Sequence, residues 1–126
     1  MQAGHSRVVT VAHGVDAVPT RAPFKERRGL LFVGALDAGS PNEDSVLFFA
    51  REVLPRLQEG REPIILTVVG CRISVAVGAL SGSTVTVCEN VSDLQPLFER
   101  TRVFVAPTRF SAGIPLKLID AASRMV

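Results

Sequence analysis

The sequence predicts an α/β domain in which helices cover both faces of a parallel sheet. Four short runs are rich in apolar and β-branched residues, as in strands that are buried on both faces. Segments in which apolar residues recur at helical spacing alternate with these runs. The chain has 126 residues, of which 47% are hydrophobic, so it can form one domain with a sizeable core.

The first strand and the first helix are predicted from residues 30–58. Residues 30–36 begin with the apolar run Leu-Leu-Phe-Val, which suits a core strand. The segment Ser40–Glu43 is a capping box with proline at the first helical position, so a helix should begin there and continue to about Gln58. Its apolar stripe comprises Val46, Phe49, Val53 and Leu57, and is widened by Leu47, Ala50 and Leu54.

The alternation continues to the end of the chain. Further strands are predicted at residues 64–69, 84–87 and 103–106, and further helices at 72–80, 93–100 and from Pro115 onward. The strand at 103–106 is apolar without alternation, so we expect it to be covered on both faces and to be ended by Pro107. Four residues of the last helix would pack on the sheet: Leu118, Ala121, Ala122 and Met125.

Residues 1–29 differ from the rest of the chain and are predicted to be a linker between domains. Residues 8–12 are mostly apolar and could form a short strand, whereas residues 17–28 hold two prolines and five charges, which is typical of a loop. The polar residues near the start exclude a signal peptide. We therefore expect the folded domain to occupy residues 30–126.

Composition excludes several classes of function. The net charge is only +2 and the basic residues form no cluster, which argues against nucleic-acid binding. No apolar run approaches the roughly 20 residues that a membrane span needs. Cys71 and Cys88 have the spacing of neither a metal site nor a disulfide framework, which favours a reduced, cytoplasmic setting. His5 and His13 have no acidic partner at the spacing of a hydrolase dyad.

The strongest candidate site is the loop between the last predicted strand and the last helix. Gly113 permits a ligand to approach the backbone closely, and Pro115 suits a first helical turn. The free amides of that turn would face the carboxyl end of the strand, where parallel sheets bind anions. Lys117 lies in the same turn, and Asp120 follows on the same side of the helix. Together they could hold the phosphates and ribose of a nucleotide.

The segment RFSAGIPLKLIDAA, from Arg109 to Ala122, resembles the donor-site signature of group 1 glycosyltransferases, which have the GT-B fold. The resemblance covers roughly residues 30–123 and includes the segments LLFVGAL, SPNEDSV, VVG, VSDL and VFVAP. It implies a Rossmann-like domain that forms the C-terminal, donor-binding half of that fold. The implied reaction transfers a sugar from a nucleoside-diphosphate sugar with retention of configuration and without an obligatory metal or other cofactor.

The resemblance also implies roles for individual residues. Lys117 and Arg109 would neutralise the leaving diphosphate. The other implied donor contacts are Asp120 for the ribose, Val91 beside the base, and Gly34, Ala112, Gly113 and Ile114 for phosphate or sugar. Family members often carry cations in the loop after the first strand, whereas residues 35–41 carry none here.

Each of these candidates also has a plain structural reading. Lys117 could be a solvated helix lysine, Arg109 a surface arginine, and Asp120 the i,i+4 partner of Arg124. Gly34 could simply end a strand, and the residues around Gly113 could form an ordinary tight loop. The sequence alone leaves both readings open.

Compared with the family, the chain begins at the interdomain connection and stops just after the donor-site helix. We therefore expect a truncated domain without the acceptor-binding N-terminal half, which binds donor weakly and transfers no sugar alone. The open edge of a four-stranded sheet predicts a homodimer. One alternative is a non-catalytic nucleotide-binding or interaction module. A phosphoacceptor domain would need clustered acids after the first strand, where only Asp37 stands.

Overall fold

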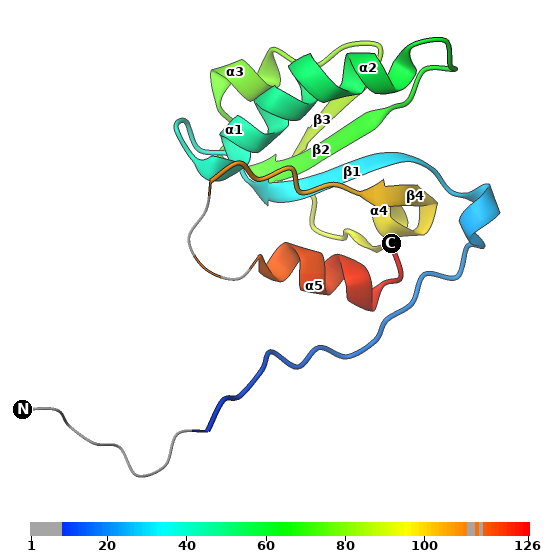
Figure 1. Ribbon diagram of the computed structural model, residues 1–126, viewed down its shortest axis with the longest axis vertical. Helices are drawn as coiled ribbons and strands as arrows, with labels where there is room; N and C mark the ends of the chain where they lie inside the picture. The colour runs from blue at the N-terminus through cyan, green and yellow to red at the C-terminus, as the bar shows by residue number, and fades with distance from the viewer. Residues whose placement is uncertain (1–8, 111–112, 114) are drawn as a thin grey trace, which may run out of the picture.

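The computed structural model describes residues 9–110, 113 and 115–126. A four-stranded parallel sheet lies between two layers of helices (Figure 1). The strands are β1 (Arg28–Ala35), β2 (Leu66–Cys71), β3 (Val85–Glu89) and β4 (Thr101–Phe104), in the order β3-β2-β1-β4. This confirms the predicted three-layer, Rossmann-like α/β fold.

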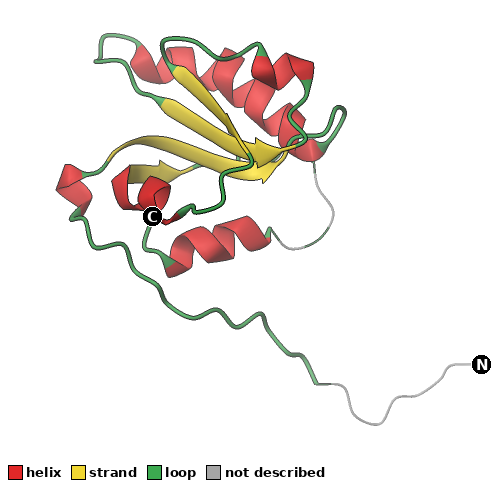
Figure 2. Ribbon diagram, turned by 180° about the vertical axis from the view of Figure 1, so that it is seen from behind, coloured by secondary structure: helices red, strands yellow, loops and turns green. Residues whose placement is uncertain are grey.

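Helices that come before and after β3 cover opposite faces of the sheet. One face carries α1 (Pro41–Phe48), α2 (Leu54–Gln58) and α3 (Val75–Gly78), and the other carries α4 (Gln95–Arg100) and α5 (Leu116–Ser123) (Figure 2). A short 3-10 turn, η1 (Phe24–Glu26), precedes β1. Within the described residues no helix has the length and apolar character needed to cross a membrane.

The strand order places a topological switch point between β1 and β4. Leu30 of β1 pairs with Leu66 of β2 on one side and with Val103 of β4 on the other. The chain moves outward from β1 through β2 to β3, and then crosses to the opposite side of β1 to form β4. In parallel sheets of this kind, ligands bind at the carboxyl ends of the two strands that flank this reversal.

Two apolar clusters, one on each face, hold the layers together. Phe32 and Val68 are fully buried against the α1–α3 layer, where they pack with Val46. On the opposite face, Leu31 and Phe98 are equally buried and pack with α5. Because β1 contributes its alternate residues to both clusters, it is the central strand of the core.

The predicted helix over residues 41–58 is present but is not a regular α-helix throughout. It begins as expected, with the Ser40 side chain accepting a hydrogen bond from the Glu43 amide at 3.1 Å. A π-helical turn, η2 (Phe49–Val53), then joins α1 to α2 just before Pro55, which has no N–H to donate. The predicted apolar stripe is wrong only at its end. Leu54 is buried and Val53 is partly buried against the core, whereas Leu57 is 37% exposed.

The prediction that the strand at 103–106 is covered on both faces is also wrong. β4 spans Thr101–Phe104 and lies at one edge of the described sheet, and Val103 is 44% exposed. The strand ends before Pro107, although the Val105 amide still donates to the Leu31 carbonyl oxygen at 2.8 Å. An uninterrupted apolar run indicated a strand correctly but did not indicate its place in the sheet.

The apolar stripe predicted for α5 faces the sheet only at Ala121, which is 2% exposed. Leu118 and Met125 are exposed, as is Ala122. The reason is that two cationic side chains occupy the inner side of the helix, where Lys117 lies over the ring of Phe32 and Arg124 over that of Phe98. Long cationic side chains can cover apolar surface with their stems, so hydrophobic spacing alone predicted the wrong buried face for α5.

The N-terminal segment does not form the short strand predicted at residues 8–12, since residues 9–12 have no regular structure and Val8 lies outside the described residues. The segment instead runs beside α5. The Val18 amide donates to the Ser123 carbonyl oxygen at 3.0 Å, and the Thr20 amide to that of Arg124 at 3.1 Å. The segment is therefore tied to the end of the last helix.

Candidate functional site

The candidate site lies at the carboxyl ends of β1 and β4, where sheets of this topology form their ligand crevice, and it is called the crevice below. Four pieces of chain meet there: the loop after β1, the first turn of α1, the loop after β4 and the first turn of α5. Side chains from the two helices contact one another across it, although Asn42 and Lys117 are 75 positions apart in sequence. The sheet topology therefore assembles the site that the sequence placed in one loop.

Lys117 lies in the first turn of α5 with its side chain directed toward the sheet. Its Nζ donates a hydrogen bond to Oδ1 of Asn42 and stands 4.7 Å from the centre of the Phe32 ring. Burial lowers the pKa of this ammonium group below the ordinary lysine value, because removal of water disfavours the charged form. Among the described residues no carboxylate forms a salt bridge with it.

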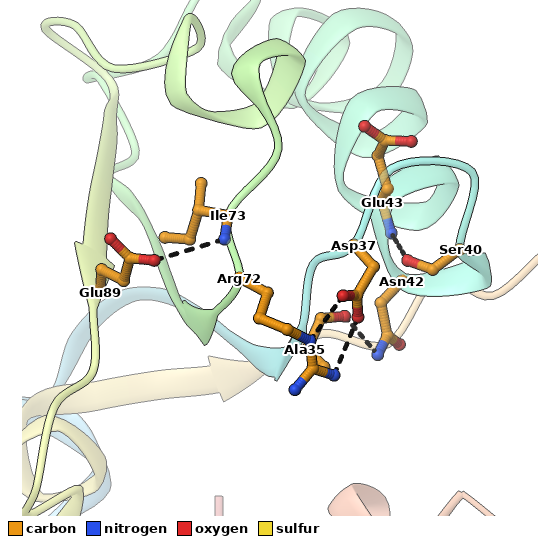
Figure 3. A network of polar contacts seen from close by, with 8 residues as sticks. All are labelled: Ala35, Asp37, Ser40, Asn42, Glu43, Arg72, Ile73 and Glu89. Atoms are coloured by element: carbon orange, nitrogen blue, oxygen red, sulfur yellow. Dashed lines mark hydrogen bonds and ion pairs between the residues drawn. The ribbon is translucent and has the colours of Figure 1, made fainter.

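Asn42 connects Lys117 to the end of β1. Its Nδ2 donates to the Ala35 carbonyl oxygen at 2.9 Å (Figure 3). Gly34 leaves the space that this side chain needs, because a Cβ at that position would lie 2.8 Å from Nδ2 of Asn42. The predicted site residue Gly34 thus lies in the crevice, where it makes room for a protein side chain.

Arg109 reaches the crevice from the loop after β4 but is paired with protein. Its Nε donates to Oδ2 of Asp44 at 2.9 Å, a second nitrogen donates to Oδ1, and the guanidinium lies 4.7 Å from the Phe48 ring centre. Hydrogen bonding from Arg109 lowers the pKa of Asp44. The contact ties this loop to α1 and compensates the charge of Arg109.

The loop after β1 does have a cation beside it, contributed by another part of the chain. Arg72, in the loop after β2, donates to both carboxylate oxygens of Asp37, with Nη2 to Oδ2 at 2.9 Å (Figure 3). Arg72 has a φ of 50°, in the left-handed region, so the backbone changes direction at the end of β2. The hydrogen bond from Arg72 lowers the pKa of Asp37. Sequence reasoning missed this pair because its members are 35 positions apart.

Other predicted site residues have different surroundings. Asp120 accepts from Nε of Arg124 at 3.3 Å, the i,i+4 pair that was its structural alternative. Val91 is partly buried against the cluster that contains Phe98. Gly113 is exposed with φ of 89°, a left-handed conformation that favours glycine. Ala112 and Ile114 lie outside the described residues.

The arrangement places a cation at the switch point, where an anion would be attracted. A partly buried ammonium attracts an anion more strongly than an exposed one, because less water screens it. The partner of Lys117 is a neutral amide, so its charge is available to a ligand that enters the crevice. Gly113 presents backbone without side-chain bulk, since a Cβ there would meet nothing within 4 Å, whereas the space at Gly34 is taken by Asn42.

Comparison with known proteins identifies a family for most of the chain. The family profile described as "Glycosyl transferases group 1" matches residues 27–126, from the start of β1 to the end of the chain. No curated protein and no solved structure gives a significant match. The matched segment contains β1, α1, β4 and α5, and therefore every element of the crevice. The chain belongs to the group 1 glycosyltransferase family.

Proposed function

We propose that this chain is the donor-binding domain of a glycosyltransferase and that its crevice holds the diphosphate of a nucleoside-diphosphate sugar. The observation that carries the proposal is the position of Lys117. Its ammonium group lies at the switch point of the sheet, partly buried and in contact with a neutral amide and an aromatic ring. Rossmann-like sheets bind phosphate groups at this place.

In the proposed reaction the sugar leaves the nucleoside diphosphate, and negative charge develops on the departing phosphate oxygen. Lys117 would stabilise that charge, and it would do so most strongly in a crevice from which the donor has displaced water. Arg109 would hold the loop after β4 through Asp44 and would add a second cation when the donor competes for it. No metal or other cofactor is needed for this role of the lysine.

The remaining donor contacts are proposed from the family pattern. Asp120 would accept hydrogen bonds from the ribose hydroxyls after release from Arg124, and Val91 would flank the base. The backbone near Gly113 would approach the phosphate or the sugar. We further propose that an acceptor-binding domain is required for transfer, so that this chain alone binds the donor without turning it over.

A non-catalytic nucleotide-binding module is the second candidate function. The observation in its favour is that Arg109 and Asp120 are both engaged by protein side chains, which would weaken their contacts with a donor. Both candidates require nucleotide binding, but only the first requires a sugar. A nucleoside-diphosphate sugar that binds with a lower Kd than its nucleoside diphosphate would favour the glycosyltransferase.

Nucleoside diphosphates are expected to stabilise the protein against heat. A ligand present at ten times its Kd adds about 1.4 kcal/mol to the free energy of unfolding, which raises the Tm of a domain of this size by about 3 to 7 °C. UDP, GDP and ADP should be compared at millimolar concentration by differential scanning fluorimetry. Inorganic pyrophosphate and the matching nucleosides separate the contribution of the phosphates from that of the base.

Lys117→Ala should lose this ligand-dependent shift, and its matched control is Lys25→Ala. Lys25 is the other lysine of the chain and is exposed in η1, so its removal makes the same charge change away from the crevice. It should keep the full ligand-dependent shift. The binding proposal is rejected if the Tm of the wild type changes with neither pyrophosphate nor any of the three nucleoside diphosphates.

We also propose that the chain forms a homodimer through the edge at β4. The edge residue Val103 is 44% exposed and, with Leu30 and Ile64, lines a groove of about 800 Å³. An open edge and adjoining apolar surface favour pairing with a second copy. Multi-angle light scattering at micromolar concentration should give the dimer mass, and Val103→Lys should shift the protein toward the monomer. A monomeric wild type contradicts this proposal.

A further inference from the structure

We infer that Asn42 is a positioning residue that orients the Lys117 ammonium group toward the crevice, a role that rests on the proposed function of this site. Asn42 lies in the first turn of α1, and Lys117 lies in the first turn of α5. The hydrogen bond between their side chains joins the two helices across the carboxyl end of β1. The family resemblance pointed to Lys117 but gave Asn42 no role beyond the capping segment.

The orientation of the Asn42 amide follows from its second partner. The Ala35 carbonyl oxygen can only accept, so Nδ2 must face it, and Oδ1 must then face Lys117. The turn that carries Asn42 is fixed by the Ser40 cap, and Gly34 leaves room beneath the amide. Asn42 is thus held by its backbone and by β1 before any ligand arrives, as a group that positions another side chain must be.

The neutrality of Asn42 is the second part of the inference. The nearby carboxylates have other partners: Glu43 accepts from the Gly39 amide at 2.6 Å, Asp44 pairs with Arg109, and Asp120 pairs with Arg124. A carboxylate at position 42 would compensate the lysine charge and compete with phosphate. An amide oxygen orients the ammonium group while leaving its charge for the ligand.

Two substitutions separate these effects. Both variants lose the Nδ2 donor to the Ala35 carbonyl oxygen, so they differ in what faces Lys117. Asn42→Ala leaves no acceptor there, whereas Asn42→Asp supplies a charged one that suits a helix N-terminus. The pKa of Lys117 can be followed by NMR of lysine labelled with ¹³C at Cε, because the chain has only Lys25 and Lys117, and Lys25→Ala assigns the signals. We expect the Lys117 pKa to fall in Asn42→Ala and to rise in Asn42→Asp.

Nucleoside-diphosphate binding should weaken in both variants despite these opposite changes in pKa. Loss of the acceptor should raise the Kd for the best-binding nucleoside diphosphate about three- to tenfold, and the competing carboxylate should raise it by at least about tenfold. A purely structural role for Asn42 would lower stability without moving the pKa of Lys117. If Asn42→Ala does not fold, the pKa in Asn42→Asp decides the question alone.

Ser81→Asp is the charge-matched control, since it adds one negative charge in an exposed turn that precedes β3. It should change neither the Lys117 pKa nor the Kd. A Lys117 pKa that stays at its wild-type value in both Asn42 variants overturns the inference. A pKa that responds in a protein that binds no diphosphate supports the Asn42–Lys117 coupling and rejects the proposed function, so the two failures can be told apart.

Discussion

Replacing Lys117 with methionine is expected to raise the Kd for nucleoside diphosphates by about 10- to 100-fold without lowering thermal stability. Hydrogen bonds to charged groups contribute about 1.5 to 3 kcal/mol, and the ammonium group is the central cation of the proposed site. Methionine keeps a flexible apolar side chain of similar length against the Phe32 ring. Isothermal titration calorimetry measures the Kd, and calorimetric scanning measures the Tm.

The stability of the wild type should also depend on the protonation of Lys117. Burial lowers its folded-state pKa from the ordinary value of 10.5, so the unfolded chain binds more protons between these two values. The free energy of unfolding therefore gains a contribution as pH rises through that window, and the charged form is a cost below it. Lys117→Met removes both the cost and this contribution to the pH dependence.

The comparison of the two lysine variants makes the result specific. Lys25→Ala loses the same charge and should keep wild-type affinity. A Lys117→Met protein that binds diphosphates as tightly as the wild type would show that the crevice is not the binding site. A large fall in Tm would show instead that Lys117 mainly holds α5 on the sheet.

Gly70→Ala is expected to lower the free energy of unfolding by about 3 kcal/mol. Gly70 pairs with Gly34 in the register of β2 and β1, and a Cβ at Gly70 would lie 2.2 Å from the Gly34 carbonyl oxygen and 2.9 Å from Cδ1 of Leu36. The first contact is with backbone, so a change of rotamer cannot relieve it. The strands would have to separate at their carboxyl ends, where the proposed site lies.

Gly78→Ala supplies the control for this substitution. A Cβ at Gly78 would meet nothing within 4 Å, and the residue ends α3 with ordinary helical geometry. Alanine there should leave stability unchanged or raise it by up to about 1 kcal/mol. Urea unfolding followed by circular dichroism compares the two variants. Equal midpoints for both would contradict the close packing of β1 on β2.

The sequence predicted the elements whose signals are local. Residues 30–36 and 64–69 are apolar runs that end near glycine, and they form the two central strands. The Ser40–Glu43 capping box marked the start of α1 correctly because its hydrogen bonds lie within one turn. Alternation of strands and helices was then sufficient to predict the layers and the parallel sheet.

The sequence did not predict which face or edge of a strand or helix packs against the rest of the fold. The apolar run at 103–106 looked like a central strand, but Val103 lies at the sheet edge. The spacing of Leu118 and Met125 predicted a buried face, whereas Lys117 and Arg124 occupy the inner side of α5 over aromatic rings. Hydrophobic periodicity cannot indicate that a cationic side chain will cover a ring.

The candidate site was predictable in its location but not in its contacts. The helix start near Lys117 at the carboxyl edge of the sheet follows from motif and topology. The partners of the polar residues do not, because each contact joins distant segments: Lys117 with Asn42, Arg109 with Asp44 and Arg72 with Asp37. Such pairs are formed only when the sheet brings its strand ends together.

The wide turn η2, which joins α1 to α2, holds one more residue than a regular α-helix would hold over the same rotation. Each α-helical residue turns the chain by about 100° and a π-helical residue by somewhat less, so about four α-helical residues turn the chain as far as the five residues of η2. Removing one residue between Phe49 and Val53 should therefore give a regular α-helix and leave Leu54 facing the core. The same deletion inside α1 has no wide turn to absorb it and should cost far more, because it would rotate every following helical residue by about 100°.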